Sequence, residues 1–273
     1  MDAKRVGVDA EHEMWWGQYQ IPVGAARYWR VGALDLFVTR KEQGWLVQSF
    51  ENRLDDAALP PLEMAREIDW MPENTAADVV HYRVPDQADL LTLLPRLADR
   101  PVVSRPRMPF NVGPGATVTL YVGTPLWMEL RAGNEALLLC ELPLMRPLQT
   151  WFGASTYEGE LCYAGRTHCR THAEEVPLRP WRAMSPLRLE NQGTTGWLLD
   201  RLALPVPQLP LFGAPDGRLW TSSLSTRRNA EGELGDIRIG SSVPNEPGPW
   251  TELGKPRQGG SSSVLGRFYG KLF

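Results

Sequence analysis

The fold is decided by residues 117–142, which read TVTLYVGTPLWMELRAGNEALLLCEL. β-Branched, aromatic and leucine side chains recur along this stretch, and the Ala-Gly-Asn triplet at 132–134 supplies residues that favour a tight turn. The pattern predicts two short strands at 117–122 and 126–130, followed by the turn and a strand at 136–142. The last two of these strands are expected to form a hairpin. Short strands separated by turn signals are typical of a β-sandwich.

The returning strand contains an uninterrupted apolar run at residues 136–140. A strand without alternation is expected to be covered on both faces, which would make Cys140 a buried thiol. The same short-strand pattern continues outward from this centre, and Gly44 can close a hairpin between two of the strands. The further strands expected are 34–40, 45–51, 79–84, 184–190, 197–204, 219–225 and 236–239, and two hairpins are expected among the last four of them, 184–190 with 197–204 and 219–225 with 236–239.

Two helical features interrupt the strand pattern. Asp86 can cap a short helix that runs through four leucines to Leu94 and stops at Pro95. A helical turn is also expected at residues 62–66. Four prolines between Pro101 and Pro114 favour extended backbone there, because proline restricts its own φ and the residue before it.

These patterns predict an all-β fold of two packed antiparallel β-sandwich-like units with few short helices. A chain of 273 residues is long enough for two modest cores. The expected division is an N-terminal β unit at 1–98, a β-sandwich at 99–255, and a flexible linker with an amphipathic tail at 256–273.

Composition narrows the function classes. The net charge of −3 and the scattered basic residues argue against a nucleic-acid-binding protein. No apolar run approaches the roughly 18 residues that span a bilayer, and acidic residues stand where a signal peptide would have its apolar core. Three cysteines without framework spacing favour a reducing cytoplasm over a disulfide scaffold.

Residues 158–172 gather most of the chemically versatile side chains, including two of the three cysteines and two of the four histidines. On an extended strand, alternate residues share a face. The even face would carry Glu158, Glu160, Cys162, Ala164, Arg166, His168, Arg170 and His172. The odd face is less polar and is expected to pack. A ligand-binding surface is therefore predicted at Glu158, Glu160, Arg166, His168 and Arg170.

A zinc site is the sharpest hypothesis for this face, because Cys162, His168 and His172 offer ligands that zinc accepts. Residues four apart on a flat strand are roughly 13 Å apart, whereas zinc ligands converge within about 2.3 Å of the metal. The site would need a bend or a ligand from another strand. The favoured alternative is that no metal binds and that Cys162 is a small buried apolar residue.

A carboxylate hydrolase is the second hypothesis. Glu158 and Glu160 would lie about 7 Å apart along a strand, a separation found for paired acids in glycoside hydrolysis. The alternative is that both glutamates are ordinary solvated residues. A nucleophile elbow is absent, since Gly153-Ala154-Ser155 lacks the closing glycine.

Aromatic residues suggest a binding role. The chain has 11 tryptophans, and alternation does not force Trp15, Trp16, Trp151 or Trp181 inward. Tryptophan is enriched at protein interfaces because it buries a large area at low entropic cost. For any one of them, however, a place in the core is the favoured interpretation.

The C-terminal tail follows a Gly/Ser-rich linker and forms an amphipathic pattern with basic residues. Such a tethered peptide suits docking to a protein partner or to an anionic membrane surface. The residues predicted to make this contact are Arg267, Phe268, Lys271, Leu272 and Phe273. The alternative is that the tail folds back on its own domain.

Several blocks resemble a known family: Pro125-Leu126-Trp127, Thr150-Trp151-Phe152-Gly153, Gly159 to Ala164, and Leu204-Pro205-Val206-Pro207. They are similar to motifs of an uncharacterised prokaryotic family, the domain of unknown function numbered four hundred and thirty-two. The likeness is clearest between Pro101 and Trp220. It implies a prokaryotic β protein and transfers no catalytic residue, cofactor or ligand.

The sequence as a whole favours a non-catalytic accessory protein that binds a protein or membrane-associated partner and carries no cofactor. The alternative is a metal-dependent or carboxylate hydrolase that uses the face at 158–172, with zinc as its cofactor. Elemental analysis of the purified protein separates the two, because a stoichiometric transition metal would favour the enzyme.

Overall fold

The computed structural model describes residues 14–52, 59, 62–69, 78–84, 89–134, 136–153, 155–167, 169–240 and 249–259. Within these residues the chain is almost entirely β, and its helical content is two single 3-10 turns, η2 (Ala173–Glu175) and η3 (Val206–Gln208). The predicted all-β fold with several packed sheets is therefore confirmed. The strands are β1 (Gly17–Gln20), β2 (Ala26–Val31), β3 (Leu34–Lys41), β4 (Gly44–Glu51), β5 (Glu63–Ile68), β6 (Asp78–Arg83), β7 (Leu90–Leu97), β8 (Val102–Pro106), β9 (Phe110–Val112), β10 (Thr117–Ala132), β11 (Leu137–Pro143), β12 (Leu148–Gly153), β13 (Gly159–Thr167), β14 (Arg182–Asn191), β15 (Trp197–Leu199), β16 (Leu202–Leu204), β17 (Leu211–Gly213), β18 (Leu219–Thr221), β19 (Leu224–Arg228), β20 (Arg238–Ile239) and β21 (Thr251–Gly254).

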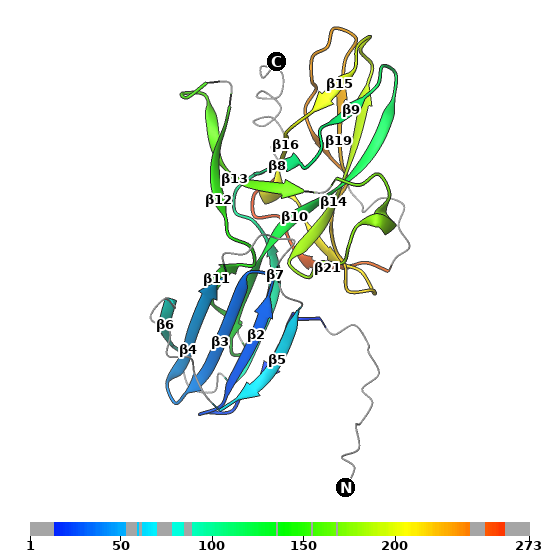
Figure 1. Ribbon diagram of the computed structural model, residues 1–273. Helices are drawn as coiled ribbons and strands as arrows, with labels where there is room; N and C mark the ends of the chain where they lie inside the picture. Colours follow the sequence, from blue (N-terminus) through cyan, green and yellow to red (C-terminus); the bar gives the residue numbers. More distant parts are fainter. Residues whose placement is uncertain are drawn as a thin grey trace.

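One sheet comes from the N-terminal part of the chain and has the order β5-β2-β3-β4-β6 (Figure 1). Its central hairpin, β3 with β4, confirms the hairpin predicted at residues 34–51. Gly44 has a φ of 152°, and a Cβ at this position would collide with the carbonyl oxygen of Tyr82. The turn and the neighbouring strand β6 thus both require glycine here.

The largest sheet is built around β10, which changes partners along its length. Residues 117–125 pair with β14, whereas residues 126–132 pair with β7 and β11. The two short strands predicted in this stretch are therefore one strand of 16 residues. Pro125 does not break it, because its missing amide falls where the β14 ladder ends and the β7 ladder begins.

One core serves both sheets. The even-numbered side chains of β10 are buried from Leu120 to Leu130, and all of them except the polar Thr124 belong to a single apolar cluster. That cluster also contains Trp29 and Trp45 of the N-terminal sheet and Trp197 of β15. Strands on both sides of the division predicted between residues 98 and 99 thus share one sheet and one core, and independent folding of two units stays a prediction.

The two predicted helical features are wrong in the described residues. The leucines expected in a helix at 86–94 lie in strand β7, whose burial alternates residue by residue with Leu91, Leu93 and Leu97 inward. The strand passes through Pro95 because β1 ends its pairing at Leu93, so no ladder is interrupted on that side. The helical turn predicted at 62–66 is strand β5, which pairs with β2.

The strand predicted at 136–142 is present as β11, but it is not covered on both faces as expected. β11 pairs only with β10 among the described residues, and Leu137 and Leu138 are about half exposed, at 50% and 47%. Cys140 is half-buried rather than part of the core. An apolar run does not force burial when the strand lies at the edge of a sheet and one of its faces has no layer above it.

Strand connectivity in the C-terminal half departs from simple hairpins. β14 does not pair with the next strand but lies parallel to β18 and β19, and β15 pairs with β9. The hairpin predicted between residues 184–190 and 197–204 is therefore wrong. β19 does pair with β20, as predicted for residues 219–225 and 236–239. Most pairs are antiparallel, as expected, with parallel pairs also between β13 and β8.

Candidate functional site

The stretch predicted to carry chemistry forms part of a four-stranded sheet with the order β12-β13-β8-β16. β12 and β13 make an antiparallel hairpin with a register from Leu148↔Ala164 to Gly153↔Gly159. β13 also pairs in parallel with β8. Figure 1 shows the tip of the hairpin extending away from the rest of the ribbon, with β12 as the outer strand.

The base of the hairpin is fixed to the body of the molecule by Tyr163. Its ring packs on Trp127 of β10 with the ring centroids 5.2 Å apart. Its hydroxyl donates a hydrogen bond of 2.8 Å to Asp99 Oδ1. Burial, followed by that hydrogen bond to a carboxylate, raises the pKa of Tyr163. The hairpin therefore projects from a firm base rather than from a loop.

The tip is ordered by short-range hydrogen bonds. Ser155 Oγ accepts from the amides of Tyr157 and Glu158 at 3.2 and 3.0 Å. Trp151 Nε1 donates to the carbonyl oxygen of Ser155 at 2.8 Å. A Cβ on Gly159 would lie 2.7 Å from Trp151 Nε1, so the indole lies directly against this glycine. These contacts therefore fix the orientation of the Trp151 indole.

The even face of β13 packs inward at its centre. Cys162 is fully buried in a small cluster with Val103, Phe152 and Ala203. Burial, with the charge of Glu160 as a further cause, raises the pKa of the Cys162 thiol to about 12. A metal ligand or a nucleophile must be the thiolate, so this thiol is suited to packing.

The two glutamates occupy different surroundings. Glu158 is exposed near the tip, whereas Glu160 is half-buried beside Phe152 in the register of the hairpin. Burial raises the pKa of Glu160, and its Oε1 atom has no hydrogen-bond partner among the described residues. Nothing in this geometry joins the two carboxylates around a common substrate position, and their catalytic role stays a prediction.

The strand predicted to continue to residue 172 ends at Thr167. Arg166 is exposed near the end of β13. Arg170 is also exposed, and its backbone forms an isolated β-bridge with Tyr121. His172 has left the sheet altogether, and its Nδ1 lies 3.6 Å from Glu175 Oε1. The single even face expected across residues 158–172 is therefore wrong beyond Thr167, because the chain turns toward η2.

His168 lies outside the described residues, as do the tail residues Arg267, Phe268, Lys271, Leu272 and Phe273. Elsewhere in the described part of the chain, no three His, Cys, Asp or Glu side chains are grouped closely enough to hold a metal ion. The zinc site at Cys162, His168 and His172 and the partner contact of the tail both stay predictions.

Comparison with known proteins places the chain in a family. The family described as protein of unknown function (DUF432) matches residues 15–272. This chain belongs to that family. The resemblance of the motif blocks is thereby confirmed, and it extends over almost the whole chain. No curated protein and no solved structure matches the chain. In this DUF432 chain, no helix among the described residues is long and apolar enough to cross a bilayer.

The odd face of the hairpin, expected to pack, packs at its base through Tyr163 but is exposed nearer the tip in this DUF432 chain. Trp151 and Leu161 are directly opposite each other in the register and are 47% and 41% exposed. Tyr157 at the tip is 96% exposed. Leu148 is 55% exposed as well, but it pairs with Ala164 and therefore lies on the opposite face of the hairpin from Trp151. Trp151 and Leu161 therefore form an exposed apolar pair on one face of the projecting hairpin.

The four tryptophans considered as interface residues differ in their burial. Trp15 and Trp181 are core residues, and Trp16 is half-buried. Only Trp151 among them lies on an exposed strand face. The signal that distinguishes it is the composition of its strand, Leu-Gln-Thr-Trp-Phe-Gly, which contains large apolar residues but no charge.

Proposed function

We propose that this chain is a non-catalytic binding protein that pairs an extended segment of a protein partner with the outer edge of β12. The observation that carries the proposal is an uncharged outer strand whose exposed side chains include Trp151. Adding a strand to an exposed sheet edge is a recurrent mode of peptide recognition, in which main-chain hydrogen bonds supply affinity and side-chain contacts supply specificity.

The composition of β12 supports this role. Outer strands of sheets usually carry lysine, proline or a bulge, which prevent uncontrolled pairing with other chains. The six residues of β12 include no charged residue and no proline, and the register of the β12–β13 hairpin contains no bulge. A strand left without these protections is expected to have a partner.

The exposed side chains add a specific contact. Trp151 and Leu161 form one apolar surface, and Tyr157 is exposed in the neighbouring tip. Tryptophan and tyrosine are the residues that most often dominate interface energetics. Because the hydrogen bond to Ser155 and the contact with Gly159 already orient Trp151, little side-chain entropy is lost on binding.

The test uses short displayed peptides selected for binding to the wild-type chain. We expect the selected peptides to carry alternating apolar residues and to slow hydrogen exchange at the amides of β12. The double substitution Trp151→Ala/Leu161→Ala should weaken binding on the order of thirtyfold, the effect of losing about 2 kcal/mol at an interface.

The matched control is Leu198→Ala, because Leu198 is 56% exposed and belongs to β15, which is in a different sheet from the hairpin. This variant should bind the selected peptides like the wild type. Peptides that bind all three proteins equally, or that protect amides outside β12, would refute the proposal.

We further propose that the protein works in the cytoplasm. All three cysteines, Cys140, Cys162 and Cys169, are free thiols, which fits a reducing compartment. The hydrolase alternative at residues 158–172 gains no support from the described residues, since Cys162 is buried and the two glutamates do not converge.

A further inference from the structure

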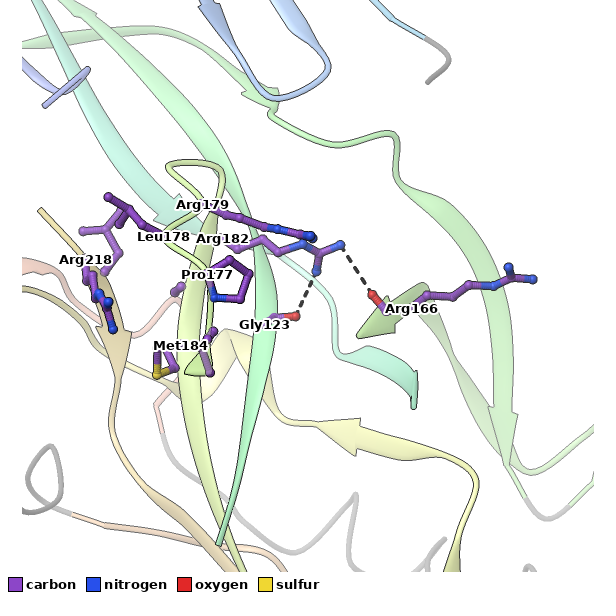
Figure 2. A pocket seen from close by; sticks show the side chains of 11 residues that line it. Gly123, Arg166, Pro177, Leu178, Arg179, Arg182, Met184 and Arg218 are labelled. Carbon is purple, nitrogen blue, oxygen red and sulfur yellow. Dashed lines mark hydrogen bonds between the residues drawn. The ribbon is translucent and has the colours of Figure 1, made fainter. Parts of the chain in front are cut away.

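Hollows of different size lie along β14. The one drawn in Figure 2 is lined by Gly123, Arg182 and their neighbours, and its volume of about 50 Å³ is too small for a metabolite. Another has a volume of about 360 Å³ and is lined by side chains from β14, from β19 and from the segment 229–238. We name it the β19 groove. Small-molecule sites usually measure about 300 to 1,000 Å³, so this groove is large enough for a small ligand.

The lining of the β19 groove is polar and charged. The described residues that line it include three arginines and three acidic residues, one large apolar side chain, Leu234, and no aromatic ring. Nucleobases stack on aromatic rings, and lipid chains need apolar walls. The lining therefore suits a polar ligand rather than a nucleobase or a lipid chain.

Two arginines lie on either side of Ser225. Ser225 is opposite Arg188 in the parallel ladder of β14 with β19, and it is opposite Arg238 in the antiparallel ladder of β19 with β20. Since neighbouring strands are about 4.8 Å apart, the backbones of the two arginines are separated by roughly 10 Å. An anion placed over Ser225 would therefore lie within reach of both guanidinium groups.

Both arginines are available to a ligand. Arg188 and Arg238 are exposed. Within the described part of the chain, neither side chain forms an ion pair or a hydrogen bond. Two cations held near each other without a counter-charge attract an anion, and the serine hydroxyl between them can donate a further hydrogen bond.

The nearest acidic side chain has partners of its own. Glu190 follows Arg188 by two residues and is opposite Arg227 in the ladder with β19. Arg227 Nε lies 3.5 Å from Glu190 Oε2, and Gln192 Nε2 donates to Glu190 Oε1 at 2.6 Å. An anion over Ser225 would be about 7 Å further along the strands. Because Arg227 offsets the charge of Glu190, the repulsion at that distance is small.

The wall of the groove is formed by the loop between β19 and β20, and its backbone is held in place. The amide of Glu233 donates to Asn229 Oδ1 at 2.7 Å, and the amide of Asn229 donates to the carbonyl oxygen of Glu233 at 2.9 Å. The amide of Gly235 donates to the carbonyl oxygen of Arg227 at 2.7 Å. The loop thereby places the exposed carboxylates of Glu233 and Asp236 in the lining. Carboxylate oxygens accept hydrogen bonds from hydroxyl groups.

We propose that the β19 groove binds a phosphate monoester of a sugar or another polyol. Its phosphate lies over Ser225 between Arg188 and Arg238, and its hydroxyl groups donate to Glu233 and Asp236. Guanidinium groups bind phosphate oxygens through paired charge-assisted hydrogen bonds. The strands of this groove are in a different sheet from β12, and the site does not depend on the function proposed for the edge of β12.

The first experiment measures binding to the full chain by titration calorimetry. The probes are glucose 6-phosphate and glycerol 3-phosphate, and the comparison compounds are glucose, inorganic phosphate and propyl phosphate, which is glycerol 3-phosphate without its hydroxyl groups. We expect at least one of the two polyol phosphates to bind on the order of tenfold more tightly than every comparison compound, because each of these lacks half of the proposed recognition. Failure of both polyol phosphates, or equal binding of inorganic phosphate or propyl phosphate, would overturn the proposal.

The second experiment places the site. Arg188→Ala and Arg238→Ala should each weaken binding of the polyol phosphate roughly tenfold or more, as for loss of a charged hydrogen bond. Circular dichroism and the melting temperature should be unchanged in both variants, because each removes an exposed side chain without a partner in the described part of the chain. Unchanged binding in both variants would place the ligand elsewhere and refute this site.

The matched control is Arg105→Ala. Arg105 is an exposed arginine of β8, which is in a different sheet from the β19 groove. This variant should bind the polyol phosphate like the wild type. Equal weakening by all three arginine substitutions would mean that general positive charge, rather than this groove, attracts the probes.

Discussion

At the scale of single residues, burial governs the cysteine chemistry of this protein. Burial is the largest cause that raises the pKa of Cys140 and Cys169 to about 11 and that of Cys162 to about 12. The neutral thiol is therefore the stable form in the folded chain. The favoured interpretation of the sequence, that Cys162 is a small buried apolar residue, is confirmed by the packing of Val103, Phe152 and Ala203 around it.

The burial of Cys162 predicts slow thiol chemistry. In the variant Cys140→Ser/Cys169→Ser, Cys162 is the one thiol left. We expect it to react with an aromatic disulfide reagent at pH 8 roughly a thousand times more slowly in the folded than in the unfolded protein, because thiolate is the reacting species. Rapid reaction of the folded variant, with an unchanged circular dichroism spectrum, would contradict the buried position.

The raised pKa of Cys162 also makes the stability of the folded chain depend on pH. The unfolded chain releases the thiol proton above roughly pH 8.5, whereas the folded chain keeps it until about pH 12. The contribution of Cys162 is therefore complete below roughly pH 8.5 and is lost as the pH rises toward 12.

At the scale of elements, Arg257 connects the chain after β21 to the sheet around β10. Its Nε donates to the carbonyl oxygen of Leu97 at 2.8 Å, and its Nη1 and Nη2 donate to the two carboxylate oxygens of Glu141 at 3.1 and 2.6 Å. Its amide also donates to the carbonyl oxygen of Pro207 at 2.8 Å. A forked guanidinium contact of this kind fixes three elements relative to one another.

Removal of this contact should destabilise the protein measurably. We expect Arg257→Ala to lower the free energy of unfolding by about 1 to 3 kcal/mol in urea, because the pair is bidentate and mostly shielded from water. Glu252→Ala on the exposed face of β21 is the control and should change stability little. A double-mutant cycle with Glu141→Ala isolates the coupling. Additive effects of the two substitutions would mean that the contact contributes nothing to stability.

At the scale of the whole molecule, β10 unites the two halves. Its first part belongs with β14 and its second part with β7 and β11, and the side chains on its inner face lie in one core. The N-terminal sheet therefore covers a layer that is completed by residues beyond position 98. Cooperative unfolding of the whole protein is the expected behaviour of such a shared core.

A fragment test follows from the position of β7. The fragment 1–98 ends with β7 and lacks β10, the strand that pairs with β7 from Leu91 to Leu97. We expect this fragment to be unfolded by circular dichroism, because Leu91, Leu93 and Leu97 would lose the layer that covers them. A cooperative unfolding transition in the isolated fragment would instead support the division at residue 98.

The sequence by itself determined the class of fold and the local hairpins. β3 with β4 and the strands of β10 and β11 follow from β-prone runs joined by glycine-containing turns, which act within a few residues. The leucines at 90–94 did not reveal their structure in this way, because so short an apolar run fits a helix as well as a strand. These leucines form strand β7 because β1 and β10 pair with it on its two sides.

Only the tertiary structure decided which faces are buried and which residues converge. The exposure of Trp151 depends on what packs against the hairpin. A hollow lined by Gly123, Arg166, Arg179, Arg182 and Arg218 is formed by residues from separate strands and loops. Propensity and turn chemistry act between neighbours in sequence, whereas burial and convergence depend on long-range packing, so no local pattern could have disclosed them.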